Sequence, residues 1–82
     1  MSVGEYGMTL NQLKIGSSGI IVAVGGSGAL RRRLLDMGLT PGTQVYVRKT
    51  APLGDPIELS LRGYTLSMRA ADAGNIEIEE VK

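Results

Sequence analysis

The sequence predicts a small all-β protein, an antiparallel β-barrel of about five short strands with one short α-helix between the first two strands. Three observations predict it: the chain has only 82 residues, apolar and polar residues alternate in several short segments, and glycine or proline separates these segments. A chain of this length forms one domain, whose net stability is only about 3–5 kcal/mol. We expect residues 1–8 to form a flexible N-terminal segment and residues 9–82 to form the domain.

The first part of the domain contains a turn and a strand. Thr9 and Gln12 have the spacing of a capping box, which predicts a short helical turn over residues 10–13. Residues 19–24 are apolar and mostly β-branched, with no polar alternation. Such a run is typical of a strand that lies centrally in the sheet and is buried on both faces.

The segment between Ser27 and Gly38 predicts the single helix. Ser27 can cap its start, and Gly38 can end it because glycine readily adopts the left-handed conformation of helix C-termini. Spacing of i, i+4 and i+7 places three apolar residues on one face, which we expect to be buried: Leu30, Leu34 and Met37. Leu35 lies away from this stripe and is therefore a candidate for contact with another segment or a partner.

Four further strands follow from alternating apolar residues. They are expected in residues 43–49, 57–62, 64–69 and 76–81, with a hairpin turn at Arg62-Gly63 and one helical turn before the last strand. The residues that should face the core are Val45, Val47, Ile57, Leu59, Leu61, Ile76 and Ile78.

Composition excludes several kinds of chemistry. The chain has no cysteine and no histidine, so we expect no enzyme activity, no cofactor and no tightly held transition metal. Glu77 and Glu79 share a strand face, where an acidic edge that discourages strand pairing explains them better than a metal site. The glycines at 25–28 lack the lysine of a phosphate-binding loop, so we interpret them as a turn.

Charge and hydropathy limit the partners and the location. The formal net charge is +1, and three successive arginines, residues 31–33, point in three directions on a helix, so we expect no nucleic-acid partner. The longest apolar run, residues 20–24, is far shorter than the roughly 20 residues of a membrane span. The N-terminus has no secretory signal. We therefore expect a cytoplasmic protein that is not inserted in the membrane.

Several short motifs occur in a specific order: Leu-x-x-Leu-x-x-Gly at 10–16, Arg-Leu-Leu-Asp-Met-Gly-Leu-Thr-Pro-Gly at 33–42, Ala-Pro-Leu-Gly-Asp-Pro-Ile at 51–57, Leu-x-Met-Arg at 66–69, and Ala73 before Ile76. In this order and spacing the chain resembles FeoA, the small ferrous iron transport protein A family of bacteria. The resemblance implies an SH3-like β-barrel that binds and modulates the membrane GTPase FeoB through its cytoplasmic part.

Two alternatives remain open from the sequence. SH3-like barrels also form the C-terminal domain of iron-dependent repressors of the diphtheria toxin repressor type, so a regulatory binding module is one alternative, and a small-barrel nucleic-acid binder is the other. Whether the chain activates, inhibits or scaffolds the GTPase is not evident. The oligomeric state is also open, a weak homo-oligomer being one alternative.

The predicted partner surface combines the helix with the proline loop, which we expect to adjoin it. Apolar residues beside arginine are typical of interfaces, and a loop held by two prolines loses little entropy on docking. The predicted partner-binding residues are Arg31, Arg32, Leu35, Pro52, Leu53 and Pro56. The competing interpretation is that Leu35 and Leu53 cover each other or the open end of the barrel.

Overall fold

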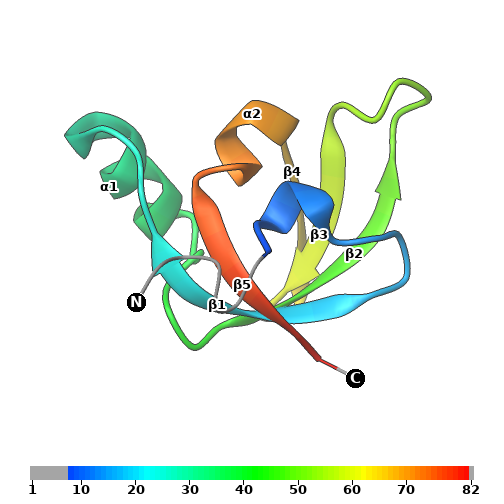
Figure 1. Ribbon diagram of the computed structural model, residues 1–82, viewed down its shortest axis with the longest axis horizontal. Coiled ribbons are helices and arrows are strands. Elements are labelled where there is room, and N and C mark those ends of the chain that lie inside the picture. Colours follow the sequence, from blue (N-terminus) through cyan, green and yellow to red (C-terminus); the bar gives the residue numbers. More distant parts are fainter. Residues whose placement is uncertain (1–7, 82) are drawn as a thin grey trace.

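The computed structural model describes residues 8–81 and consists of one curved antiparallel sheet with short helices around it (Figure 1). The elements in chain order are η2 (Leu10–Gln12), β1 (Ser18–Val24), α1 (Gly28–Asp36), β2 (Gln44–Thr50), β3 (Ile57–Leu61), β4 (Tyr64–Met68), α2 (Ala70–Ala73) and β5 (Ile76–Val81). The strand order is β4-β3-β2-β1-β5, and every neighbouring pair is antiparallel. The predicted all-β architecture, with one helix between the first two strands, is confirmed.

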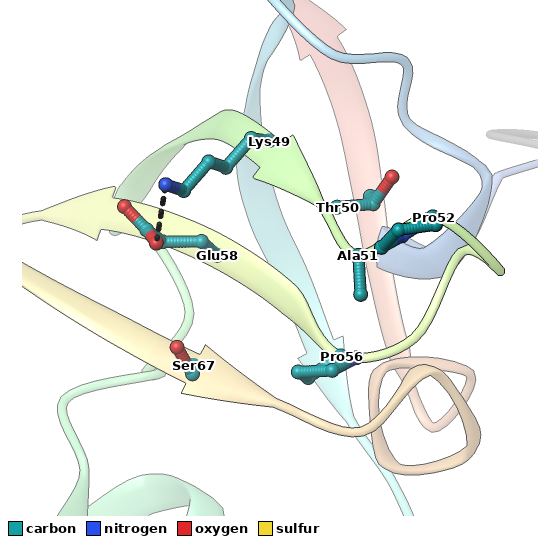
Figure 2. A pocket seen from close by; sticks show the side chains of 7 residues that line it. All are labelled: Lys49, Thr50, Ala51, Pro52, Pro56, Glu58 and Ser67. Atoms are coloured by element: carbon teal, nitrogen blue, oxygen red, sulfur yellow. Dashed lines mark ion pairs between the residues drawn. The ribbon is translucent and has the colours of Figure 1, made fainter.

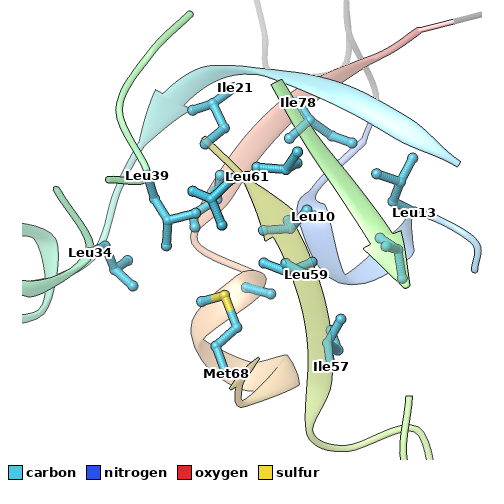
Figure 3. Close-up of a cluster of buried hydrophobic side chains, with 14 of the residues drawn as sticks. Leu10, Leu13, Ile21, Leu34, Leu39, Ile57, Leu59, Leu61, Met68 and Ile78 are labelled. Carbon is cyan, nitrogen blue, oxygen red and sulfur yellow. The ribbon is translucent and has the colours of Figure 1, made fainter. Parts of the chain in front are cut away.

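The hydrophobic core lies on the concave side of the sheet, where the helices complete it (Figure 3). Every residue that alternation assigned to the core is buried, which confirms the predicted inward faces of β2, β3 and β5. Leu10 of η2, Leu34 of α1 and Ala73 of α2 are buried with them. The core residues are Leu10, Leu13, Ile21, Val24, Leu34, Leu39, Val45, Val47, Ile57, Leu59, Leu61, Met68, Ala73, Ile76 and Ile78.

Strand β1 corrects one prediction. It does lie between two strands, β2 and β5, but only one of its faces is buried. Ile21 and Val24 enter the core, whereas Ile20 is 38% exposed on the outer face and Val22 is half-buried. The apolar run suggested burial on both faces, but a single curved sheet encloses only one core and leaves its convex side open to solvent.

Helix α1 begins and ends where the sequence predicts. The Ser27 side chain accepts a hydrogen bond from the Leu30 backbone at 3.4 Å, and Gly38 has a φ of +95°. Gly38 and Leu39 donate backbone hydrogen bonds to the carbonyls of Leu35 and Leu34, at 3.0 and 3.1 Å. These two bonds form a Schellman motif, which requires the left-handed conformation at Gly38.

Burial along α1 departs from the predicted stripe. Leu34 is buried, but Leu30 and Met37 are only half-buried. Leu35, which we expected away from this stripe and in contact with another segment or a partner, is half-buried and packs against the core. The Schellman turn bends the chain back under the helix, so the C-terminal turn of α1 buries more of its circumference than a straight amphipathic stripe predicts.

The two ends of the described chain meet along β5. Gln12 accepts a hydrogen bond from the Thr9 backbone at 2.9 Å, which confirms the predicted capping box. Thr9 pairs with Glu77, and the Met8 carbonyl accepts a hydrogen bond from Ile78 at 3.0 Å. The predicted flexible segment falls, apart from Met8, outside the described residues, so its boundary stays a prediction.

Candidate functional site

The loop between β2 and β3, residues 51–56, is held in one shape by its own backbone. The Gly54 N–H donates to the Ala51 carbonyl at 2.7 Å, and the Ala51 N–H donates to the Pro56 carbonyl at 3.0 Å. Gly54 has a φ of +84°, a conformation that side chains resist. We refer to residues 51–56 as the proline loop. Its internal hydrogen bonds support the prediction that it is ordered before any partner docks.

Leu53 is the most exposed large apolar side chain among residues 8–81. It is 96% exposed, whereas Ile15, the next in order, is 58% exposed. Pro52 and Pro56 beside it are also exposed. Because Leu53 makes almost no contact that shields it from water, it contributes little to folding and is available to contact another molecule.

A cavity of about 310 Å³ lies at the base of the proline loop (Figure 2). Its walls come from both prolines and from the ends of three strands; the lining residues are Lys49, Thr50, Ala51, Pro52, Pro56, Glu58 and Ser67. Glu58 lies opposite Lys49 on β2 and Ser67 on β4, and its carboxylate forms ion pairs with Arg48 at 3.3 Å and Lys49 at 3.9 Å. The loop therefore presents an apolar tip above a hollow with a charged rim.

Helix α1 forms a second, different surface. Its arginines point in separate directions, as predicted: Arg31 Nε donates to the Val24 carbonyl at 3.0 Å, and Arg33 forms an ion pair with Asp72 at 3.3 Å. Arg32 is exposed. Two of the three guanidinium groups thus fasten the helix to its neighbours instead of facing a partner together.

The structure does not bring the six predicted partner-binding residues into one surface. Arg31, Arg32 and Leu35 lie on α1, and the proline loop lies at the far end of the molecule (Figure 1). The prediction that the helix adjoins the loop is therefore wrong. The physical reason is strand β2: the chain reaches it from α1 and leaves it for the proline loop, and seven extended residues span about 20 Å.

Two groups of contacts were missed from the sequence. The β3–β4 hairpin clamps the chain after α1, because Tyr64 donates its hydroxyl to the Met37 carbonyl and Arg62 donates to Thr43 at 2.8 Å. Asp55 of the proline loop accepts a hydrogen bond from the Ala70 backbone at 2.9 Å. The signal for the second contact is the missing cap of α2: Arg69 occupies the cap position and has no side-chain acceptor to offer.

Residues 8–81 contain no group of three or more carboxylates placed to hold a metal ion. Within the same range, no helix combines the length and the apolar character needed to cross a bilayer. What the geometry does provide is a small β-barrel that carries an ordered loop with an exposed apolar tip, and these features define the class of small β-barrel domains.

Comparison with known proteins identifies the family. Residues 8–80 match the FeoA domain family, so the chain belongs to it. The chain is 40% identical over 72 residues to the Fe(2+) transport protein A/Fe(2+) transporter FeoB fusion protein of Porphyromonas gingivalis. That match covers 88% of this chain but only 8% of the fusion protein.

Solved structures confirm the fold. A FeoA-like protein from Clostridium acetobutylicum superposes with a TM-score of 0.85 at 39% identity, covering 92% of this chain and 87% of that one. FeoA from Stenotrophomonas maltophilia, a procaryotic SH3 domain protein complexed with zinc, gives 0.77 at 24% identity over 88% and 89% of the two chains. The predicted SH3-like fold is therefore confirmed.

The fold also occurs in repressors. A manganese-dependent transcriptional repressor in complex with manganese superposes with a TM-score of 0.83 at 14% identity, covering 90% of this chain and 36% of that chain. At this identity the similarity concerns the fold alone. It agrees with the expectation that the barrel is shared with repressor domains and transfers no regulatory activity to this chain.

Proposed function

We propose that this chain is a cytoplasmic accessory protein of ferrous iron uptake, which binds the cytoplasmic part of the membrane GTPase FeoB and modulates it. The observation that carries the proposal is the relative from Porphyromonas gingivalis, whose name joins Fe(2+) transport protein A and FeoB in one fusion protein. Fusion replaces an encounter between two molecules by an intramolecular one, which is useful when the two parts act together. The chain acts by binding, and the chemistry belongs to the GTPase.

The proline loop is the surface that best suits this role. A rigid, exposed apolar side chain loses little entropy when it enters a pocket on a partner. Leu53 meets both conditions, since the loop is closed by its own hydrogen bonds and the side chain is 96% exposed. The arginine-bearing surface of α1, with Arg31, Arg32 and the half-buried Leu35, is a second and separate contact in this proposal.

The proposal is tested by titrating the protein against the purified cytoplasmic part of FeoB. We expect saturable binding, and we expect Leu53→Ser to weaken it by about tenfold or more, as for a central interface residue. Ile15→Ser is the matched control, because Ile15 is also an exposed aliphatic residue outside the proline loop. Circular dichroism must show that each variant is folded, and GTP hydrolysis measured in the same mixtures shows the direction of modulation.

A second variant separates the two surfaces. Arg32→Glu reverses an exposed charge on α1, so it should weaken binding only if the helix also contacts FeoB. If the parent protein fails to bind the cytoplasmic part of FeoB, the proposed function is wrong. If it binds and both variants bind like the parent, the contact lies elsewhere, and the acidic strand β5 is the next surface to alter.

A further inference from the structure

Helix α2 has its N-terminal cap supplied by a distant residue. Arg69 stands at the cap position with an extended backbone and provides no side-chain acceptor. The Oδ1 atom of Asp55, fifteen residues earlier in the chain, accepts the Ala70 N–H at 2.9 Å. The first N–H groups of a helix have no partner within it and carry partial positive charge, so a carboxylate is well suited to this position.

This contact joins the proline loop to another element. The two backbone hydrogen bonds of the loop connect Ala51 with Gly54 and with Pro56, so they fix its shape but not its direction relative to the helices. Among the residues that the structure describes, the bond from Ala70 to Asp55 is the only hydrogen bond between the loop and a segment beyond β2 and β3.

Helix α2 offers a firm support for the loop. Ala73 is fully buried in the core, and α2 packs against η2 on one side of the molecule. Asp72 also pairs with Arg33 of α1 at 3.3 Å, although this pair is exposed and contributes little. A loop attached to such an element has fewer directions open to it than one attached through its two strands alone.

We propose that Asp55 is a positioning residue, which ties the proline loop to α2 and thereby sets the direction in which Leu53 projects toward its partner. The partner is the cytoplasmic part of FeoB, and this step rests on the proposed function. The hydrogen bond that holds the loop to α2 is independent of the proposed function. Asp55 itself need not touch the partner, because its carboxylate is engaged with the Ala70 backbone.

The experiment compares Asp55→Ala with Asp55→Asn in the full chain. Alanine removes the acceptor, whereas the asparagine carbonyl oxygen preserves it without the charge. Glu79→Ala is the matched control, because Glu79 is an exposed acid on β5, outside both the proline loop and α1. Amide hydrogen exchange at Ala70 and in strand β3, together with the NMR order parameter of the Gly54 N–H, reports whether Asp55 holds the loop to α2. Titration with the cytoplasmic part of FeoB reports the effect on binding.

We expect Asp55→Ala to speed exchange at Ala70 and to lower the NMR order parameter of the Gly54 N–H, while β3 stays protected from exchange. Binding to FeoB should weaken about three- to tenfold, because fewer molecules hold the loop in the competent direction. Asp55→Asn should recover most of both effects, and Glu79→Ala should show neither.

The outcomes separate this inference from the proposed function. An unchanged order parameter at Gly54 in Asp55→Ala overturns the inference, as does faster exchange throughout β3, which would make Asp55 a general stabiliser of the fold. Unchanged affinity in that variant, when Leu53→Ser loses binding, also overturns it. If the parent does not bind FeoB, the proposed function fails, and the order parameter at Gly54 alone still decides whether Asp55 positions the loop.

Discussion

Two leucines in similar sequence surroundings differ completely in burial. Leu39 lies in Gly-Leu-Thr-Pro-Gly after α1, and Leu53 lies in Pro-Leu-Gly-Asp-Pro after β2, so both stand in short loops rich in glycine and proline. Leu39 is fully buried, whereas Leu53 is 96% exposed. The difference does not come from local composition, since both loops contain the same kinds of residues.

The difference comes from what the rest of the chain places beside each loop. The loop after α1 is clamped by the β3–β4 hairpin through Tyr64 and Arg62, and Leu39 donates its N–H to Leu34. Within residues 8–81, the proline loop has one hydrogen bond from outside its flanking strands, the one that Asp55 accepts. The loop after α1 is held by several contacts with distant segments, and its leucine is part of the core. The proline loop is held by one such contact, and its leucine projects into solvent.

The largest expected effect is on the buried leucine. Leu39→Ala should destabilise the fold by about 2–5 kcal/mol, because it leaves a cavity in a core that closes around this side chain. A small domain has about 3–5 kcal/mol in total, so the variant should be near unfolding. Urea unfolding followed by circular dichroism measures it. A midpoint like that of the parent would show that Leu39 is not part of the core and would remove the basis of the comparison.

Sequence patterns predicted the elements of this fold better than its surfaces. Alternation placed the inward faces of β2, β3 and β5 correctly, because burial on one side of a sheet imposes a period of two. Burial of Leu39 was not foreseen, because it depends on the β3–β4 hairpin that holds the chain after α1. The spacing on α1 left open whether Leu35 contacts another segment or a partner, and the structure packs it against the core. Contacts between distant segments leave no periodic pattern in the sequence.

The candidate site could be predicted only in part. Two prolines around Leu53 indicated a rigid loop, and the internal hydrogen bonds of the loop agree with that expectation. Grouping the loop with α1 was wrong because nearness in sequence was taken for nearness in space, although a full strand separates them. The contact between Asp55 and Ala70 links residues fifteen positions apart. The missing cap of α2 signals that some acceptor is needed there, but no local motif identifies the residue that supplies it.

The next largest effect on stability is expected when the left-handed glycine of each loop, Gly38 or Gly54, is replaced by valine. Gly38→Val should cost about 2–3 kcal/mol, because its φ of +95° is strained for a β-branched residue and the new Cβ would lie 3.0 Å from the Tyr64 hydroxyl. Gly54→Val has similar backbone strain but open space, so it should cost about 1–2 kcal/mol. Thermal unfolding compares the two.

Asparagine gives the control for this prediction. Gly38→Asn should be the mildest replacement at that position, since asparagine tolerates the left-handed conformation better than other side chains. Equal stability of the parent, the valine variant and the asparagine variant would contradict the left-handed assignment and place the end of α1 elsewhere.

A smaller effect tests the clamp itself. Thr43 is buried, and its hydroxyl accepts from Arg62 at 2.8 Å and lies 2.9 Å from the Thr40 hydroxyl. Thr43→Val keeps the shape and removes the acceptor, so it should cost about 1 kcal/mol. Chemical unfolding measures the loss, and Thr65→Val, on the exposed face of β4, serves as the control. If both variants unfold alike, the hairpin does not hold the loop through this hydroxyl.

The smallest effect on stability is expected at the exposed leucine. Leu53→Ser should change the free energy of unfolding by less than about 0.5 kcal/mol, because the Leu53 side chain stays exposed to water in the folded protein. The same urea titration used for Leu39→Ala measures it. A loss near that of Leu39→Ala would show that Leu53 is covered in solution and could not serve as a free contact. An unchanged unfolding midpoint together with weakened binding to FeoB would show that Leu53 contributes to partner binding and not to the stability of the fold.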